Sequence, residues 1–137
     1  MSERLQGMFV ITFDIKDQGG DDRVIFAKLP AAGIVGYDII SASVTLHAGF
    51  AADTDHYMVV TLEDGGTDGT GTAVIASRGA ASVAWAADGA YDLTMADGIP
   101  YPITAGDWLA LDHDETGTVA YAGTLSVVVA PGQRGTA

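Results

Sequence analysis

The chain has 137 residues, a formal net charge of -12, 48% hydrophobic residues and 18% charged residues. This length suits one domain over residues 1–137 and is short for two. The hydrophobic fraction argues against a disordered chain, and no apolar run is long enough to span a membrane. Because the negative charge repels phosphate backbones and anionic lipid head groups, we expect a protein that binds neither nucleic acids nor membranes.

The residue types favour short strands joined by turns. The sequence holds 18 Gly and 4 Pro, and Gly supplies the positive φ values that many tight turns require. It has no cysteine, which excludes disulfides, thiolate metal sites and a cysteine nucleophile. Residues 1–7 contain no apolar signal-peptide segment, which predicts synthesis and assembly in the cytoplasm of the cell that makes the protein.

Two strands are expected near the N-terminus. Residues 8–15 and 23–29 are rich in β-branched and aromatic residues, and the turn formers of residues 17–22 separate them. Pro30 lacks a backbone donor and ends the second strand. These segments predict a first hairpin, preceded by an N-terminal arm over residues 1–7.

The middle of the chain shows the clearest alternation. Within residues 39–47 the apolar face of the predicted strand holds Ile40, Ala42, Val44 and Leu46. One face of this strand is therefore expected to lie in the core and the other in water.

Two more hairpins are expected after it. Residues 57–62 and 72–77 predict a hairpin around a flexible Gly-rich turn. Residues 83–86 and 91–95 flank an Asp-Gly turn, the dipeptide that favours a tight hairpin connection.

The C-terminal part predicts one further strand pair. Residues 108–112 and 118–129 flank a turn at residues 113–117, and residues 131–137 are expected to fray. Eight or nine short strands without intervening helices predict an all-β protein, an antiparallel β-sandwich of jelly-roll-like type.

Two acidic segments suggest metal or acid–base chemistry. The loop that starts at Asp64 begins like a calcium loop, but Ile75 stands where the bidentate acid would be, which favours a hairpin turn. Residues 112–115 place His113 among carboxylates, and we interpret them as a solvated hairpin tip.

The sequence offers little support for an enzyme. It has no GxSxG nucleophile elbow and no HExxH motif, so we assign no catalytic, cofactor-binding or metal-ligating residue. A cupin-like metal enzyme stays open as an alternative, because His47, His56 and His113 can in principle converge in space.

Four aromatic residues are candidates for a sugar-binding platform, because aromatic rings provide flat apolar faces. They are Trp85, Tyr91, Tyr101 and Trp108. Residues of this kind more often lie in a core or a subunit interface, and the sequence leaves both interpretations open. A tail-fibre or spike module that binds a receptor or glycan is therefore an alternative function.

The turn and strand pattern resembles that of a known class of viral proteins. Residues 57–62, the Gly-rich turn at 65–71, the segment 102–107 leading to 109–111, and Thr116-Gly117-Thr118 are similar to segments of small β-sandwich structural proteins of tailed bacteriophages, in particular capsid decoration (cement) proteins. The likeness covers residues 8–129 and rests on turn chemistry and strand patterning.

The resemblance implies a virion protein on the outer surface of a capsid. Such a protein bridges neighbouring copies of the major capsid protein and is often a homotrimer. The sequence itself offers no cofactor site, so we expect no cofactor. Most of the cations lie in the first 28 residues, and the resemblance makes them candidates for capsid docking: Arg4, Lys16, Arg23 and Lys28.

Overall fold

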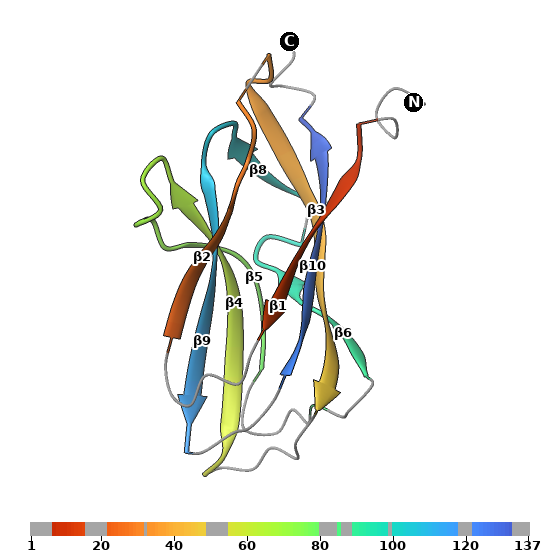
Figure 1. Ribbon diagram of the computed structural model, residues 1–137, viewed down its shortest axis with the longest axis vertical. Coiled ribbons are helices and arrows are strands. Elements are labelled where there is room, and N and C mark those ends of the chain that lie inside the picture. The colour runs from red at the N-terminus through yellow and green to blue at the C-terminus, as the bar shows by residue number, and fades with distance from the viewer. Residues whose placement is uncertain are drawn as a thin grey trace.

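The structure is a computed structural model that describes residues 7–15, 22–31, 33–48, 55–79, 85, 89–98, 100–117 and 122–132. These residues form ten strands: β1 (Phe9–Ile15), β2 (Asp22–Lys28), β3 (Gly36–Ala48), β4 (Tyr57–Gly66), β5 (Ala73–Arg78), β6 (Ala90–Asp92), β7 (Thr94–Met95), β8 (Tyr101–Thr104), β9 (Trp108–Thr116) and β10 (Ala122–Pro131). They make two five-stranded antiparallel sheets packed face to face (Figure 1). The first sheet has the order β1-β10-β3-β6, with β8 also on β3, and the second has the order β2-β9-β4-β5-β7. The predicted all-β antiparallel sandwich is confirmed, and the described residues include no helix long and apolar enough to cross a membrane.

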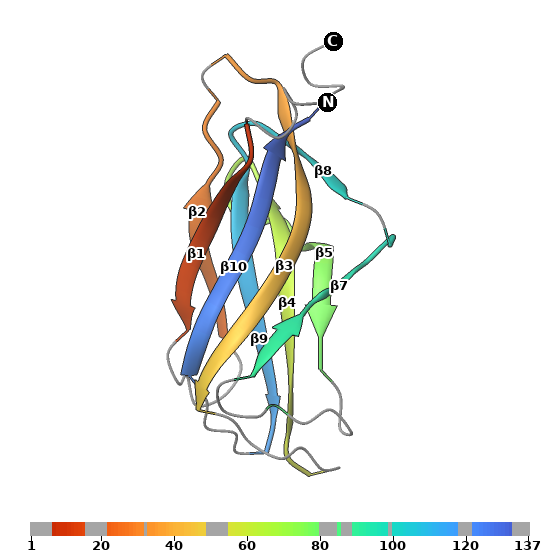
Figure 2. The same ribbon diagram turned by 90° about the vertical axis from the view of Figure 1, so that its right-hand side faces the viewer.

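The pairing of the strands is nested. The first strand pairs with the last, β1 with β10, and inside this pair lie β2 with β9, β3 with β8, and β4 with β5. A long antiparallel hairpin rolled into two sheets gives this pattern, which is the jelly-roll arrangement. Strands β1, β10 and β3 therefore lie in one layer, with β2, β9 and β4 behind them (Figure 2).

The number of strands exceeds the predicted eight or nine because one position of the jelly roll is divided. Both β6 and β8 pair with β3, whereas β7, which lies between them in the chain, pairs with β5 of the other sheet. A turn closed by the Gly98 N–H and the Met95 carbonyl, 3.1 Å apart, ends β7 after two residues. Two short strands, β6 and β8, thus share the sixth position, and the segment between them crosses to the other sheet as β7.

Two of the predicted strand pairs are wrong. The segments of the first hairpin do form strands, but β1 and β2 belong to different sheets, and so do β9 and β10. The hairpin of β4 and β5 is confirmed. Alternation of apolar residues reveals which face of a strand is buried but not which strand lies beside it. Residues 83, 84 and 86 of the remaining predicted hairpin lie outside the described residues.

A β-bulge changes one predicted face of β3. Three of the four residues expected inside are buried, but Ile40 is only partly buried and Ile39 is 0% exposed. On β10, Val128 pairs with Ser41 while Val129 pairs with Ile39, so residue 40 has no partner in the ladder. An extra residue in one strand reverses the alternation beyond it.

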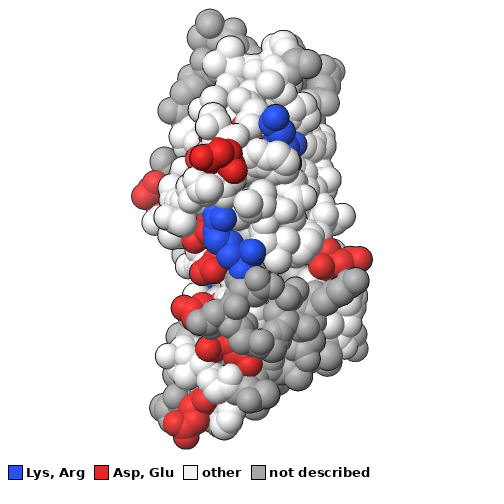
Figure 3. All heavy atoms as spheres, turned by 60° about the vertical axis from the view of Figure 1, so that its left-hand side comes forward, with Lys and Arg blue, Asp and Glu red and all other residues white. Residues whose placement is uncertain are grey.

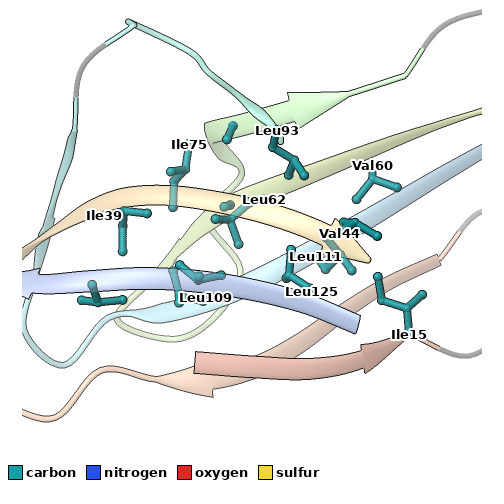
Figure 4. Packing of buried hydrophobic residues seen from close by; sticks show 14 of the residues in the cluster. Ile15, Ile39, Val44, Val60, Leu62, Ile75, Leu93, Leu109, Leu111 and Leu125 are labelled. Carbon is teal, nitrogen blue, oxygen red and sulfur yellow. The ribbon is translucent and has the colours of Figure 1, made fainter. Parts of the chain in front are cut away.

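The core fills the space between the two sheets (Figure 4). Val44 and Leu125 of the first sheet point toward Leu62 and Leu109 of the second, and all four are 0% exposed. Full burial of such a side chain contributes about 1.5–3 kcal/mol. The fold is therefore stabilised by two apolar faces that meet, as the alternating sequence predicts.

Candidate functional site

Arg23 on β2 connects its own strand to β4 and to the loop that follows β4. Its Nε donates to Glu63 Oε1 at 2.7 Å, its Nη1 donates to the Gly69 carbonyl at 2.8 Å, and its Nη2 donates to the Gly71 carbonyl. Glu63 is 7% exposed, so its carboxylate is largely removed from water and depends on this partner. We call these four residues the Arg23 clamp.

The loop between β4 and β5, residues 67–72, is held in place over the outer face of the second sheet. Thr70 donates to Asp68 Oδ1 from its backbone N–H at 3.0 Å and from its hydroxyl at 2.7 Å, and these bonds lower the pKa of Asp68. Gly69 has φ +83°, and a Cβ on it would lie 2.8 Å from Ile25 Cδ1. The expected flexible turn is therefore a fixed one, since its residues are bonded internally and its carbonyls to Arg23.

A second acidic group joins this loop to the turn between β8 and β9. Tyr101 donates from its hydroxyl to Asp64 Oδ2 at 3.0 Å. Burial, the charge of Asp64 and a hydrogen bond between the two carboxyl groups together raise the pKa of Asp107, which is 8% exposed. Burial and the same carboxylate raise the pKa of Tyr101 to about 12. The contact between the Asp64 and Asp107 carboxyl groups thus joins the end of β4 to the turn before β9.

The acids of the proposed calcium loop have structural partners. Asp64 Oδ1 accepts the Gly66 N–H at 3.0 Å, just as Asp68 accepts from Thr70, so each carboxylate closes its own turn. Across the described ranges no group of three His, Asp or Glu residues is arranged to hold a metal ion. The hairpin-turn interpretation agrees with the pairing of β4 and β5 on either side.

The segment 112–115 is not the hairpin tip that we expected. It lies within β9, which continues to Thr116 and pairs there with Tyr57 of β4. His113 is 3% exposed and points inward, and the Glu115 side chain is 2% exposed, with 3.9 Å between His113 Nε2 and Glu115 Oε2. These residues stay in the sheet because β4 extends far enough to pair with them. Since side chains alternate between the two faces of β9, those of His113 and Glu115 lie inside the sandwich.

The three histidines do not converge. His47 is exposed on the outer face of β3, with its Nε2 3.3 Å from Thr124 Oγ1, whereas His113 lies inside the other sheet. His56 is exposed just before β4. A cupin-like site built from these three imidazoles is therefore not supported by their placement.

Trp85 belongs to the core. It is 0% exposed and lies edge-to-face with Tyr91, with ring centroids 5.4 Å apart. The Arg78 guanidinium lies 5.1 Å from the Trp85 ring centre and 4.5 Å from that of Tyr91, in the range of cation–π attraction. Trp108 is half-buried with Lys28 Nζ 5.7 Å from its ring centre. Trp85 thus offers no face to a sugar, and its role in the core is one that the sequence had left open.

Two of the four candidate docking cations, Arg23 and Lys28, lie within the described residues. Arg4 and Lys16 lie outside the described residues, and Lys28 is exposed at the end of β2. The Arg23 side chain is 25% exposed and bonded within the chain, so its described role is structural. On the face shown in Figure 3 the basic atoms form separate spots with acidic atoms nearby. Docking by these cations remains a prediction.

No protein-family model and no curated protein sequence matches this chain. Among solved structures, it is similar to a structure of infectious bursal disease virus, Gx strain, at 16% identity and a TM-score of 0.43, over 94% of this chain and 33% of that one. It is also similar to PirA, at 16% identity and a TM-score of 0.39, over 86% of this chain and 90% of that one. A CocE/NonD family hydrolase from Staphylococcus aureus follows, at 9% identity and a TM-score of 0.36, over 90% and 32% respectively.

The chain spans about a third of the virus chain, and about a third of the hydrolase chain. At these low identities and TM-scores, none of the likenesses assigns a function. The function must therefore be argued from the surfaces of the chain.

Proposed function

We propose that this protein is a structural component of a virion, which binds the outer surface of a capsid and stabilises it by bridging major capsid proteins. The proposal combines the resemblance to capsid decoration proteins with one observation in the fold. On strands β1, β10 and β3 the outer face of the first sheet carries mainly hydroxyl and small apolar side chains, with carboxylates at its border on Asp14 and Asp92, although the chain as a whole has a net charge of -12.

This surface, which we call the hydroxyl face, consists of the outward side chains of three adjacent strands. They are Val10 and Thr12 of β1, Thr124, Ser126 and Val128 of β10, and Ser41, Ser43 and Thr45 of β3. Thr12 pairs with Ser126, which in turn pairs with Ser43, so the hydroxyl groups form a row across the sheet. Two carboxylates adjoin this face. Asp14 of β1 accepts a hydrogen bond from Thr124 at 3.3 Å, and Asp92 of β6 is exposed and pairs with Ser43.

A face of this kind suits contact with another protein. Burying an unpaired charge costs several kcal/mol, whereas a hydroxyl can donate and accept hydrogen bonds across an interface. The outer face of the second sheet is different, because the Arg23 clamp holds a loop over it and Asp114 of β9 is exposed there. The hydroxyl face is therefore the described sheet face that can be covered at the lower electrostatic cost.

The size of the face is consistent with a bridging role. Neighbouring strands lie about 4.8 Å apart, and successive outward side chains along one strand lie about 6.8 Å apart. The outward residues of the three strands therefore cover an area of roughly 300 Å². A stable interface buries about 800 Å² on each partner. The hydroxyl face alone is too small, so tight capsid binding requires contacts with more than one capsid subunit or added contacts from loops.

The experiment is to mix the purified protein with capsids that lack decoration and to measure occupancy by sedimentation and cryo-electron microscopy. We expect ordered, symmetry-related sites on the outer shell. Ser126→Trp, which places a large ring in the centre of the hydroxyl face, should lower occupancy, and Val74→Trp on the other sheet is the matched control. Absence of ordered binding, or equal loss in both variants, would contradict the proposal.

The docking cations need a separate test that spares the clamp. Replacing Arg4, Lys16 and Lys28 with Gln together should weaken capsid occupancy while leaving the unfolding transition nearly unchanged. Arg23 is kept, because its loss would disturb the loop between β4 and β5. Unchanged occupancy in this triple variant would refute docking by these cations.

Other parts of the proposal follow from the resemblance and from the sequence. The resemblance implies a homotrimer, whose native mass would equal three chains. Assembly in the host cytoplasm and the absence of catalytic activity are the expectations drawn from the residues themselves, and they belong to the same proposal. The alternative of a tail-fibre or spike module requires an exposed aromatic platform, and the burial of Trp85 gives that alternative no support. Saturable glycan binding by the purified protein would restore it.

A further inference from the structure

Three of the four sheet edges carry features that hinder the addition of a strand. The β2 edge has an exposed lysine, Lys28, and a register shift between Ile25 and Ala27. At the far edge of the same sheet β7 has two residues, and the far edge of the first sheet is divided into β6 and β8. Charges, irregular pairing and short edge strands are the usual means of avoiding edge-to-edge association.

The fourth edge is β1, the outermost strand of its layer (Figure 2). It is seven residues long, pairs with β10 without a register shift, and carries no charge or proline from Phe9 to Phe13. Among the described residues its only ladder is with β10. The N–H and C=O groups on the side of β1 that faces away from β10 can therefore pair with a further strand.

An apolar row lies beside this edge and is incompletely covered. It consists of Phe9, Ile11 and Phe13, which point toward the core but are only partly buried. The Phe13 ring stacks on that of Phe26 of β2, with 5.1 Å between the ring centroids. Residues directly opposite each other on paired strands share a face of the sheet. A strand beside β1 would therefore cover the apolar row if every second residue of that strand were apolar.

The same strand forms one border of the hydroxyl face, because Val10, Thr12 and Asp14 are the outward residues of β1. A protein that covers the hydroxyl face thus reaches the β1 edge without a gap. The face alone offers roughly 300 Å², whereas a stable interface buries about 800 Å² on each partner. A segment added along β1 extends the contact on both faces of the sheet and supplies part of the missing area.

We propose that β1 pairs antiparallel with an extended segment of the capsid protein that covers the hydroxyl face, an inference that rests on the proposed function. The segment has apolar side chains at alternate positions, opposite the apolar row, and a lysine or arginine opposite Asp14. Its other outward side chains are uncharged. Both ladders of β10 are antiparallel, and antiparallel pairing is slightly more stable per residue than parallel pairing.

Charge favours a cationic segment as the occupant of this edge. The chain carries a net charge of -12, and the exposed charged side chain of β1 is that of Asp14. Opposite charges directly across a ladder are stabilising, and an acidic protein attracts a cationic partner from a distance. A second copy of the chain would bring the same negative charge and is therefore the less favourable occupant.

Hydrogen exchange on decorated capsids tests the pairing through the backbone. In the free protein the amide hydrogens of β1 that face away from β10 should exchange fast, and capsid binding should slow their exchange about tenfold or more, because they become hydrogen-bonded. The β2 edge is the control, and its exchange should be the same in both states. Cryo-electron microscopy of the same particles should show an additional strand beside β1.

Two charge reversals at opposite borders of the hydroxyl face form a matched pair. Asp14→Lys should weaken capsid binding about tenfold or more, because it places two cations opposite each other. Asp92→Lys on β6 should change the affinity by less than about twofold, since it adds no charge beside the added strand. Both side chains are exposed, so both variants should keep the unfolding transition of the wild type.

The outcomes distinguish this inference from the proposed function. Protection of β1 together with a loss of affinity confined to Asp14→Lys would support strand addition. Ordered capsid binding in which β1 stays unprotected, or equal effects of the two charge reversals, would overturn strand addition and leave the proposed function intact. Absence of ordered binding would overturn both.

Discussion

Replacing Arg23 with Met tests whether the clamp stabilises the fold through a buried charge. The variant keeps most of the side-chain volume but leaves the Glu63 carboxylate, 7% exposed, without the guanidinium. Removing one partner of a buried pair costs about 3–5 kcal/mol, and the 25% exposure of the Arg23 side chain puts the expected loss near the lower end, at about 3 kcal/mol. For a chain of this size that corresponds to a fall in Tm of roughly 10 °C.

A double-mutant cycle separates the charge effect from lost packing. Arg23→Met leaves the Glu63 carboxylate buried without a positive partner, and Glu63→Met removes that carboxylate. The double variant should therefore be more stable than Arg23→Met alone by about 1–2 kcal/mol. Lys28→Met on the same strand is the control, and it should cost about 0.5–1 kcal/mol, the value of an exposed cation–π contact with Trp108.

The assay is guanidinium unfolding followed by the tryptophan fluorescence of Trp85 and Trp108, with amide hydrogen exchange at Gly71 as a local readout. The Gly71 N–H donates to the Gly65 carbonyl at 2.8 Å, and its exchange should become faster when the clamp is lost. A loss below about 1 kcal/mol in Arg23→Met, or strict additivity in the double variant, would refute the argument that the clamp is a coupled buried pair.

Three more changes have defined outcomes. Trp85→Ala should lower the unfolding free energy by about 3–5 kcal/mol, measured by denaturant unfolding, because the ring is 0% exposed. The difference in unfolding free energy between Asp107→Asn and the wild type should shift in favour of the variant as the pH rises from acid to neutral. The reason is that the raised pKa of Asp107 makes the stabilisation by its protonated carboxyl group present at low pH and lost when the group ionises. A difference that stays constant across the pH range would contradict this. Gly79→Ala, with φ +129° and a Cβ only 2.0 Å from the Met58 carbonyl oxygen, should prevent normal folding, whereas Gly33→Ala, with φ +73° and open space, should cost about 1–2 kcal/mol by thermal unfolding.

Local residue patterns predict the strands and their inner faces well. The alternation in β10 places Leu125, Val127 and Val129 inside, and all three are 0% exposed. The turn at Asp64 and the hairpin of β4 and β5 were also predictable, because the required residues are neighbours in the sequence. Those features depend on residues that are close together in the sequence.

The candidate site was only partly predictable. Arg23 stands out in the sequence as one of six cations, but its partners Glu63, Gly69 and Gly71 lie 40 to 48 residues away. The burial of His113 was missed because a cluster of acids around a histidine is typical of a loop. A possible signal was the continued alternation of Leu109, Leu111 and His113, which predicts one inner face for all three.

Residue types and local patterns are enough to identify an acidic, cysteine-free, all-β chain in which turns separate strands with one apolar face. The pairing of β1 with β10 instead of β2, the use of Arg23 inside the chain, and the place of β1 at the end of its sheet among the described residues depend on the folded arrangement. The physical reason is that period-two alternation is a local property. Strand partners, charge pairs and free edges are set by how the whole chain rolls up around one core.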